Sequence, residues 1–190
     1  MSARSRLWKS ITEQAEAWSP GNEREARALT DIRKAISESG EASISRDAGP
    51  THFTASMFVF DAQLTHVVLC YHRKGQFWVQ PGGHAEQDDD SVVSAALREL
   101  SEETGLRADD VLVWGVADID SHGLNSRFGR CKRHLDFGVA AVVRQGQLPQ
   151  LVVSDESEEL GWWPVAGLPP NCPPGFEQRL TRIRARLFAG

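Results

Sequence analysis

The spacing of hydrophobic and polar positions separates an N-terminal helical part from a later part made mostly of strands. Apolar residues recur every three or four positions over residues 4–18 and again over residues 23–39, which is the period of an amphipathic helix. Ser19-Pro20-Gly21 stops the first helix. Asn22 suits the N-cap of the second, with Glu25 at the N3 position of a capping box. The pattern therefore predicts two helices before residue 40.

Beyond residue 52 the pattern changes to short runs rich in β-branched and aromatic residues. Strands are expected over residues 53–60, 64–71, 76–80, 111–119, 134–143, 151–153 and 160–163, and helices over residues 91–104 and 176–188. Residues 40–52 are expected to form a linker and residues 120–133 a loop. Strands and helices mixed in this way, with hairpins, predict the α/β class, as an α/β/α sandwich around a mixed β-sheet.

A chain of 190 residues accommodates one domain of ordinary size together with an extension. We place residues 1–50 in a helical N-terminal extension and residues 51–190 in the domain. The three cysteines are odd in number and contain no Cys-x-x-Cys pair, which favours reduced thiols over a disulfide framework or a zinc knuckle. No apolar run is long enough to cross a bilayer and no secretory signal is recognisable, so we expect a cytoplasmic protein without a membrane partner.

The negative charge of the chain is concentrated in one short segment. The formal net charge is −5, yet residues 86–110 hold nine acidic and two basic side chains, a net charge of −7. A solvated acidic surface is the simpler explanation of such a run. The alternative is a cation site, because clustered carboxylates need a metal ion or protons to coexist. The acidic balance of the chain also disfavours nonspecific binding to nucleic acid.

The spacing of three glutamates in this segment favours the cation site. On a helix over residues 91–104, Glu99, Glu102 and Glu103 stand at positions i, i+3 and i+4, and therefore on one face. Like charges at this spacing repel one another, and the helix dipole disfavours anions near the C-terminal end. Carboxylate oxygens in this arrangement suit a hard divalent cation such as Mg²⁺ or Mn²⁺.

The segment Arg98-Glu99-Leu100-Ser101-Glu102-Glu103-Thr104-Gly105-Leu106 resembles the signature of the Nudix hydrolase family (MutT-like). That signature is Gly, five residues, Glu, seven residues, and then Arg-Glu-aliphatic-x-Glu-Glu-x-Gly-aliphatic. The second half matches in full. In the first half Asp90 stands in place of the Glu, and six residues separate it from Gly83. We interpret this as a one-residue insertion that leaves Asp90 as the helix N-cap. The resemblance covers about residues 53–165 and implies a Nudix-like fold.

The resemblance implies a metal-dependent pyrophosphohydrolase that cleaves a nucleoside diphosphate linked to another moiety. Glu99, Glu102 and Glu103 would hold Mg²⁺ or Mn²⁺ together with a backbone carbonyl of Gly82 or Gly83, and Arg98 would orient Glu99. The same four charged residues are the expected catalytic residues, with Glu102 or Glu103 as the general base. A late segment similar to one of the family supplies alternative bases and substrate contacts: Glu156, Glu158 and Glu159.

Basic residues that could bind phosphate groups gather in the expected loop. Four positive charges and no acidic residue lie between Ser121 and His134. A solvated basic loop explains them equally well. We assign substrate binding to Arg73, Arg127, Arg130 and Arg133. His122 and His134 flank the loop and are each more often structural than substrate-binding. Trp78 is expected in the core more than against a base.

Two further functions are possible on the same fold. A non-catalytic nucleotide sensor usually loses ligand glutamates, and this chain keeps all three. An isoprenoid diphosphate isomerase would need a Cys and a Glu placed to protonate a double bond, and neither Cys70 nor Cys131 has a recognisable context. The expected partner is therefore a small nucleotide and no nucleic acid. The N-terminal helices are left with three roles: covering the sheet, capping the active site or forming a homodimer.

Overall fold

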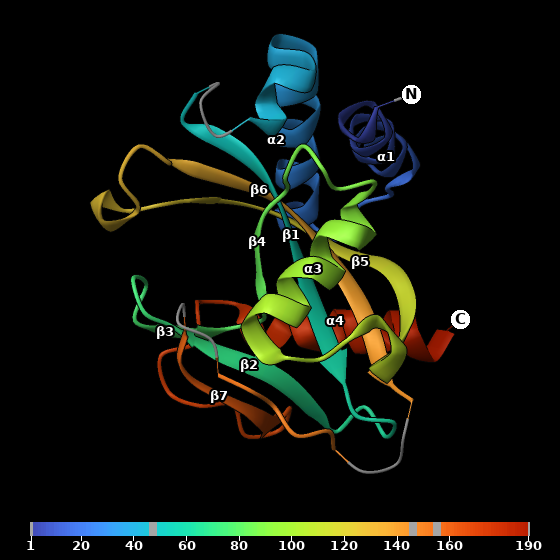
Figure 1. The fold of residues 1–190 in the computed structure, drawn as a ribbon, viewed down its shortest axis with the longest axis vertical. Coiled ribbons are helices and arrows are strands. Elements are labelled where there is room, and N and C mark those ends of the chain that lie inside the picture. The colour runs from blue at the N-terminus through green and yellow to red at the C-terminus, as the bar shows by residue number, and fades with distance from the viewer. Residues whose placement is uncertain (1, 46–48, 145–147, 154–156, 190) are drawn as a thin grey trace.

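The computed structural model describes residues 2–45, 49–144, 148–153 and 157–189, and its middle layer is a mixed β-sheet (Figure 1). Five strands follow one another in the order β3-β2-β1-β6-β5, while β4 pairs with β1 and β7 pairs with β2. The central pair β1 and β6 is parallel, and the other strand pairs are antiparallel. The strands are β1 (Thr51–Phe60), β2 (His66–His72), β3 (Phe77–Val79), β4 (Gly82–His84), β5 (Val111–Gly123), β6 (Arg133–Val143) and β7 (Ser157–Pro164).

Helices cover both faces of this sheet, so the predicted α/β/α sandwich is confirmed (Figure 1). Helices α1 (Ala3–Ala17), α2 (Glu23–Ser39) and α3 (Val92–Thr104) share one hydrophobic core with Phe53, Met57 and Phe137. Helix α4 (Phe176–Ala189) packs on the opposite face against Phe58 and Phe60. Successive side chains of a strand point to opposite faces, and β1 is buried nearly throughout because both faces are covered.

The N-terminal helices belong to the same core as the sheet. Leu7, Ile11 and Ile32 are fully buried in the cluster that also holds Phe53. Helix α2 begins as expected, since the Asn22 side chain accepts the backbone N–H of Glu25. The packing shows the first of the three roles considered for these helices, the covering of the sheet.

Buried Glu25 also ties α2 to the C-terminal helix, since it accepts a hydrogen bond from Arg186 at 2.9 Å. Burial by itself would raise the pKa of Glu25, but the hydrogen bonds from Arg186 and from the backbone N–H of Gly21 outweigh it and hold the pKa below its usual range. The N-terminal and C-terminal helices are therefore joined by a charged contact across the molecule.

Several expected boundaries are wrong, and the expected loop is the largest error. β5 continues to Gly123 and β6 begins at Arg133, so the connection spans residues 124–132 and includes a short 3₁₀ turn, Ser126–Phe128. The polar residues 120–123 belong to a strand because β6 pairs with them as far as Gly123. Residues 151–153 form no strand in the described part of the chain. The expected linker begins with a 3₁₀ turn, Gly40–Ile44. Within the described residues, no helix has the length and apolar character to span a membrane.

Candidate functional site

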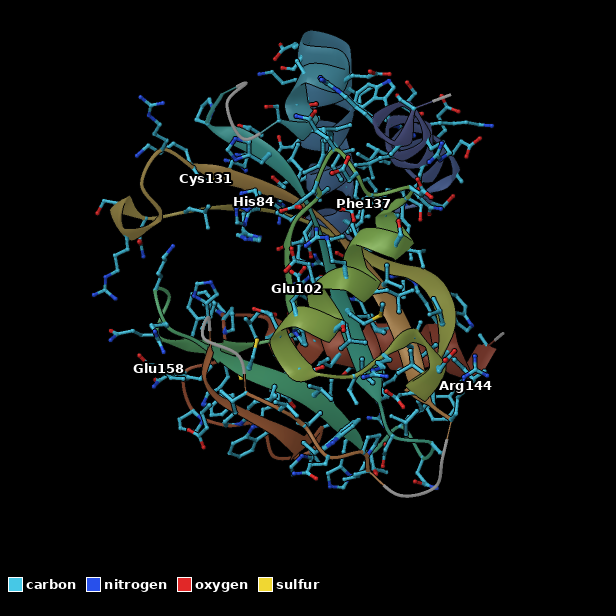
Figure 2. All side chains as sticks on the ribbon, in the orientation of Figure 1. His84, Glu102, Cys131, Phe137, Arg144 and Glu158 are labelled. Carbon is cyan, nitrogen blue, oxygen red and sulfur yellow. The ribbon has the colours of Figure 1, made fainter. Side chains whose placement is uncertain are left out.

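Helix α3 presents the three glutamates at its C-terminal half. Its N-cap is Ser91, whose side chain accepts the backbone N–H of Ser94, and its C-cap is Gly105, whose φ of 73° is the left-handed conformation that favours glycine. Glu99 and Glu103 are buried, while the Glu102 side chain is 58% exposed (Figure 2). The three carboxylates therefore share a helix face but differ in their contact with solvent.

Arg98 organises the acidic groups around the helix. Its guanidinium donates to Glu99 at 2.8 Å and to Glu102 at 3.1 Å from the same nitrogen. The other nitrogens donate to both oxygens of Asp89, at 3.1 and 3.0 Å. Burial by itself would lower the pKa of Arg98, but the hydrogen bonds to Asp89 and Glu99 outweigh it and raise the pKa above its ordinary value. Arg98 is therefore a permanent cation between carboxylates that would otherwise repel one another.

The two glycines of β4 bring the backbone against two of these carboxylates. The backbone N–H of Gly82 donates to Glu103 at 2.8 Å. A Cβ atom on Gly83 would lie 2.6 Å from both carboxylate oxygens of Glu99, closer than any side chain tolerates. Glycine is therefore required at position 83 for Glu99 to occupy its place.

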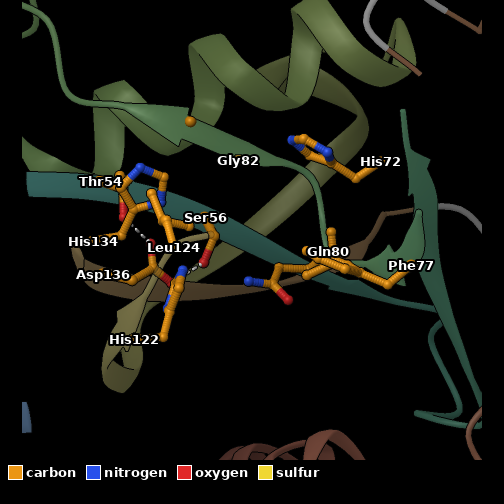
Figure 3. Close-up of a pocket in the computed structure, with 12 residues that line it drawn as sticks. Thr54, Ser56, His72, Phe77, Gln80, Gly82, His122, Leu124, His134 and Asp136 are labelled. Atoms are coloured by element: carbon orange, nitrogen blue, oxygen red, sulfur yellow. Dashed lines mark hydrogen bonds between the residues drawn. The ribbon is translucent and has the colours of Figure 1, made fainter. Parts of the chain in front are cut away.

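A cleft lined by both polar and apolar residues opens beside these glycines, on the sheet face opposite α3 (Figure 3). Its inner part, about 90 Å³, is bordered by Gly82, Gly83 and Gln80. It adjoins an outer cavity of about 400 Å³ that shares Phe77, Gln80 and His122 with it. The oxygen Oε1 of Gln80 and the nitrogen Nε2 of His134, which also lines the inner part, are buried and have no hydrogen-bond partner among the described residues. Both atoms are suited to a polar ligand that enters the cleft.

The wall of the cleft consists of polar residues in register on three neighbouring strands. Thr54 of β1 pairs with Asp136 of β6, which pairs with Asp120 of β5. Thr54 and Ser56 both donate to Asp136, at 2.8 and 2.6 Å. Two residues before Thr54 on β1, His52 pairs with His134 of β6, and His134 pairs in turn with His122 of β5. Strand register thus assembles a polar surface that no continuous stretch of sequence contains.

Two arginines neutralise Asp120 of this wall and the neighbouring buried Asp118. Arg179 of α4 donates twice to fully buried Asp118, at 2.9 and 2.7 Å, and Arg24 of α2 bonds the other oxygen of the same carboxylate. Burial by itself would raise the pKa of Asp120, but His122, Arg179 and Arg24 hold it well below the usual range. No local pattern in the sequence indicates this group, because its members lie on α2, β5, β6 and α4.

The sequence itself matches the NUDIX domain family over residues 50–183, which is more than half of the chain. The chain belongs to the NUDIX domain family. Nudix enzymes hydrolyse pyrophosphate bonds and generally use divalent metal ions, so the chain is a Nudix hydrolase. The oxygen-only donor set of Glu99, Glu102 and Glu103 on one face of α3 fits a hard divalent ion.

Solved structures support the same fold. A NUDIX family hydrolase from Clostridium perfringens is 21% identical, with a TM-score of 0.58 over 72% of this chain and 97% of its own. The dihydroneopterin triphosphate pyrophosphohydrolase of E. coli is 14% identical, with a TM-score of 0.58 over 73% of this chain and 96% of its own. The MutT protein of Methanosarcina mazei Go1 is 18% identical, with a TM-score of 0.57 over 75% and 99%. No curated protein matches the chain significantly.

Spacing and contacts favour Asp89 over Asp90 as the first acidic residue of the Nudix signature. The interpretation of Asp90 as the helix N-cap is wrong, because Ser91 occupies that position and Asp90 lies exposed with Arg6. Asp89 is buried and follows Gly83 with five residues between them, which is the spacing of the signature. The extra residue therefore lies between Asp89 and Arg98, and the bidentate contact with Arg98 is the signal that identifies Asp89.

Replacing Asp89 with asparagine is expected to lower kcat by about 10- to 100-fold, the usual effect of losing a group that orients metal ligands. Asn cannot hold Arg98 by two charge-assisted contacts, so the guanidinium would orient Glu99 and Glu102 less firmly. The neighbouring Asp90→Asn variant is the matched control and should stay within about twofold of wild type, because an exposed ion pair contributes little. Steady-state kinetics provides the measurement. A larger loss of kcat in Asp90→Asn than in Asp89→Asn would indicate that Asp90 is the first acidic residue of the signature.

The structure distributes the predicted substrate-binding residues over different surfaces. Arg127 donates to Gln76 at 3.1 Å, beside cleft residue Phe77. Arg133 instead contacts Asp31 of α2 at 3.1 Å, on the side of the sheet away from the cleft wall. Arg73 lies 3.8 Å from Glu158. Arg130 and Glu159 are exposed, and Glu156 lies outside the described residues. Trp78 is buried between Tyr71 and Trp163, as expected of a core residue.

Proposed function

We propose that this Nudix hydrolase uses Mg²⁺ or Mn²⁺ to cleave a small nucleotide derivative, a nucleoside diphosphate linked to another moiety. The observation that carries the proposal is the placement of Glu99 and Glu103 against two consecutive glycines that line the cleft. Two buried carboxylates are costly to folding unless they are neutralised. A divalent cation bound with a phosphate-containing substrate would neutralise them.

Each residue of the site then has a defined task. Glu99, Glu102 and Glu103 would hold the ion, together with a backbone carbonyl of Gly82-Gly83, and Arg98 keeps Glu99 and Glu102 in position. When bound, the ion neutralises negative charge on the attacking and leaving oxygens. Glu102 or Glu103 takes the proton of the attacking water. Glu102 has the freer access to solvent, and Glu103 lies deeper against Gly82.

The cleft supports a nucleotide as the bound moiety. A cavity of about 400 Å³ falls within the usual range of small-ligand sites, about 300–1,000 Å³. Phe77 lines both parts of the cleft and stacks on His72, and it offers a ring face to a base. Gln80 offers an amide to a polar edge, and Arg127 at the rim offers a positive charge to phosphate groups. Arg73, Arg130 and Glu159 lie outside the cleft lining and would contact only the part of a long substrate that extends beyond it.

The alternatives gain less support from the structure. Cys70 lies 3.8 Å from Glu103, which is the Cys and Glu pair an isomerase would need. Cys70 is only 1% exposed, so its thiol is poorly placed to reach a substrate and protonate it. A sensor would be expected to have lost part of the carboxylate set, whereas here Arg98 still orders it.

A panel of nucleoside diphosphate derivatives tests the proposal directly. Nucleoside triphosphates, nucleoside diphosphate sugars and dinucleoside polyphosphates would each be incubated with Mg²⁺ or Mn²⁺, and the phosphate-containing products would be followed. We expect at least one class to be hydrolysed, with loss of activity when a chelator removes the ion. Tight binding of a nucleotide without turnover in any condition would favour the sensor, and turnover unaffected by chelator would contradict the metal mechanism.

A further inference from the structure

A cysteine and two histidines meet at one end of the central strands, apart from the glutamates of α3. Cys131 lies near the end of the 124–132 connection and His84 ends β4 (Figure 2), and His52 lies on β1. The Cys131 sulfur lies 3.0 Å from Nδ1 of His52 and 3.7 Å from Nε2 of His84. All three of these atoms lie within 4.8 Å of one another. The side chains of His52 and Cys131 are buried and that of His84 is partly buried.

The two distances from the Cys131 sulfur bracket those between ligands of a single tetrahedral ion, and small side-chain rotations would bring the three atoms to that spacing. Zinc bonds of about 2.0–2.1 Å to nitrogen and about 2.3 Å to sulfur, at tetrahedral angles, place ligand atoms about 3.3–3.6 Å apart. The observed distances of 3.0 and 3.7 Å from the Cys131 sulfur lie on either side of that range. We propose that His52, His84 and Cys131 form a second metal site, which binds a borderline-soft divalent ion of the Zn²⁺ type.

The chemistry of the donors separates this site from the carboxylate site. Thiolate and imidazole select zinc-like ions, whereas carboxylates suit Mg²⁺ and Mn²⁺. Three protein ligands also leave a fourth position for water, an arrangement found in open zinc sites and not in closed structural ones. The two sites can therefore be filled by different ions in the same protein.

His84 connects the two sites. Its backbone carbonyl accepts a hydrogen bond from Arg98 at 2.9 Å, and its ring belongs to the Cys131 cluster. The ring also lies 4.8 Å from that of His134, which lines the cleft. An ion held by Cys131 would in addition tie the 124–132 connection to β1 and β4, and this connection contributes Leu124 and Asn125 to the cleft. The site is therefore placed to hold the outer wall of the cleft in position.

Metal binding to the full chain tests the proposal. Protein stripped with a chelator would be titrated with Zn²⁺ alone, without nucleotide or Mg²⁺, and then with Co²⁺, whose absorption reports tetrahedral geometry and a thiolate ligand. Wild type should bind one equivalent of Zn²⁺ and show the thiolate–cobalt band. Cys131→Ser should abolish the band and weaken Zn²⁺ binding by more than the roughly 10- to 100-fold that follows loss of an outer contact.

Matched variants keep the outcome decisive. Cys172→Ser removes a half-buried cysteine outside the cluster and should bind like wild type. His84→Gln gives a second loss of binding should Cys131→Ser fail to fold, as judged by circular dichroism. Glu103→Gln should retain the Zn²⁺ site, which separates it from the carboxylate site. Absence of stoichiometric Zn²⁺ binding in wild type, or its loss in Glu103→Gln with retention in Cys131→Ser and His84→Gln, would overturn the proposal.

Discussion

Replacing Glu103 with glutamine is expected to lower turnover by about 10²- to 10⁴-fold, the range lost with a general base, and to weaken binding of the divalent ion. In the wild type the backbone nitrogen of Gly82 lies 2.8 Å from a carboxylate oxygen of Glu103. Glutamine removes the negative charge but keeps an oxygen that can accept this hydrogen bond, so the local structure should persist. Steady-state rates over a range of Mg²⁺ concentrations provide the measurement. A defect that high Mg²⁺ repairs marks Glu103 as a ligand, and one that persists at saturation marks it as the base as well.

Two companion variants make this result specific. Glu102→Gln tests the other candidate base, and whichever variant keeps the larger defect at saturating Mg²⁺ identifies the base. Asp88→Asn removes an exposed charge of the same acidic segment and should leave the rate unchanged. Wild-type activity in both glutamine variants would refute the proposed mechanism, whereas an equal loss in Asp88→Asn would indicate that the net charge of the segment is what matters.

Replacing Arg179 with methionine is expected to destabilise the fold by about 3–5 kcal/mol, because it leaves a buried carboxylate with too little compensation. Asp118 is fully buried and receives two hydrogen bonds from Arg179, whose guanidinium also lies 3.6 Å from Asp120 and 3.9 Å from Asp136. Methionine fills similar space without a charge. The free energy of unfolding from urea denaturation at neutral pH is the measurement.

The same variant should show a characteristic pH dependence. Burial raises the pKa of Asp118 despite Arg179 and Arg24, and loss of Arg179 should raise it further. Asp118 of the folded variant then binds its proton at a higher pH than in the unfolded chain. The loss in free energy of unfolding relative to wild type should therefore shrink as the pH is lowered to about 5. Arg182→Met, on the exposed side of α4, is the control and should be nearly neutral. A stability of Arg179→Met equal to that control would mean that the aspartates do not depend on Arg179.

Local patterns in the sequence determined the helices and the carboxylate face of α3. The period of the apolar positions predicted α1, α2, α3 and α4 to within a few residues, because one helix face must be buried whatever covers it. The i, i+3 and i+4 spacing of Glu99, Glu102 and Glu103 likewise depends only on helix geometry. The signature from Arg98 to Leu106 also indicated the family, because its residues are consecutive and lie on one helix and the turn that ends it.

Pairing between distant strands decided what the sequence could not. His52, His84 and Cys131 are widely separated along the chain and meet only because β1 pairs with β4 and β6. Asp89 was passed over for Asp90 because the choice depends on a loop contact with Arg98, and the spacing to Arg98 favoured the wrong neighbour.

Arg133 was assigned to phosphate, yet it lies on the sheet face toward α2, because alternate residues of a strand point to opposite faces. Composition and periodicity report how a residue relates to its own helix or strand. The register between strands is set by burial on both faces of the finished sheet, and it therefore appears only in the tertiary structure.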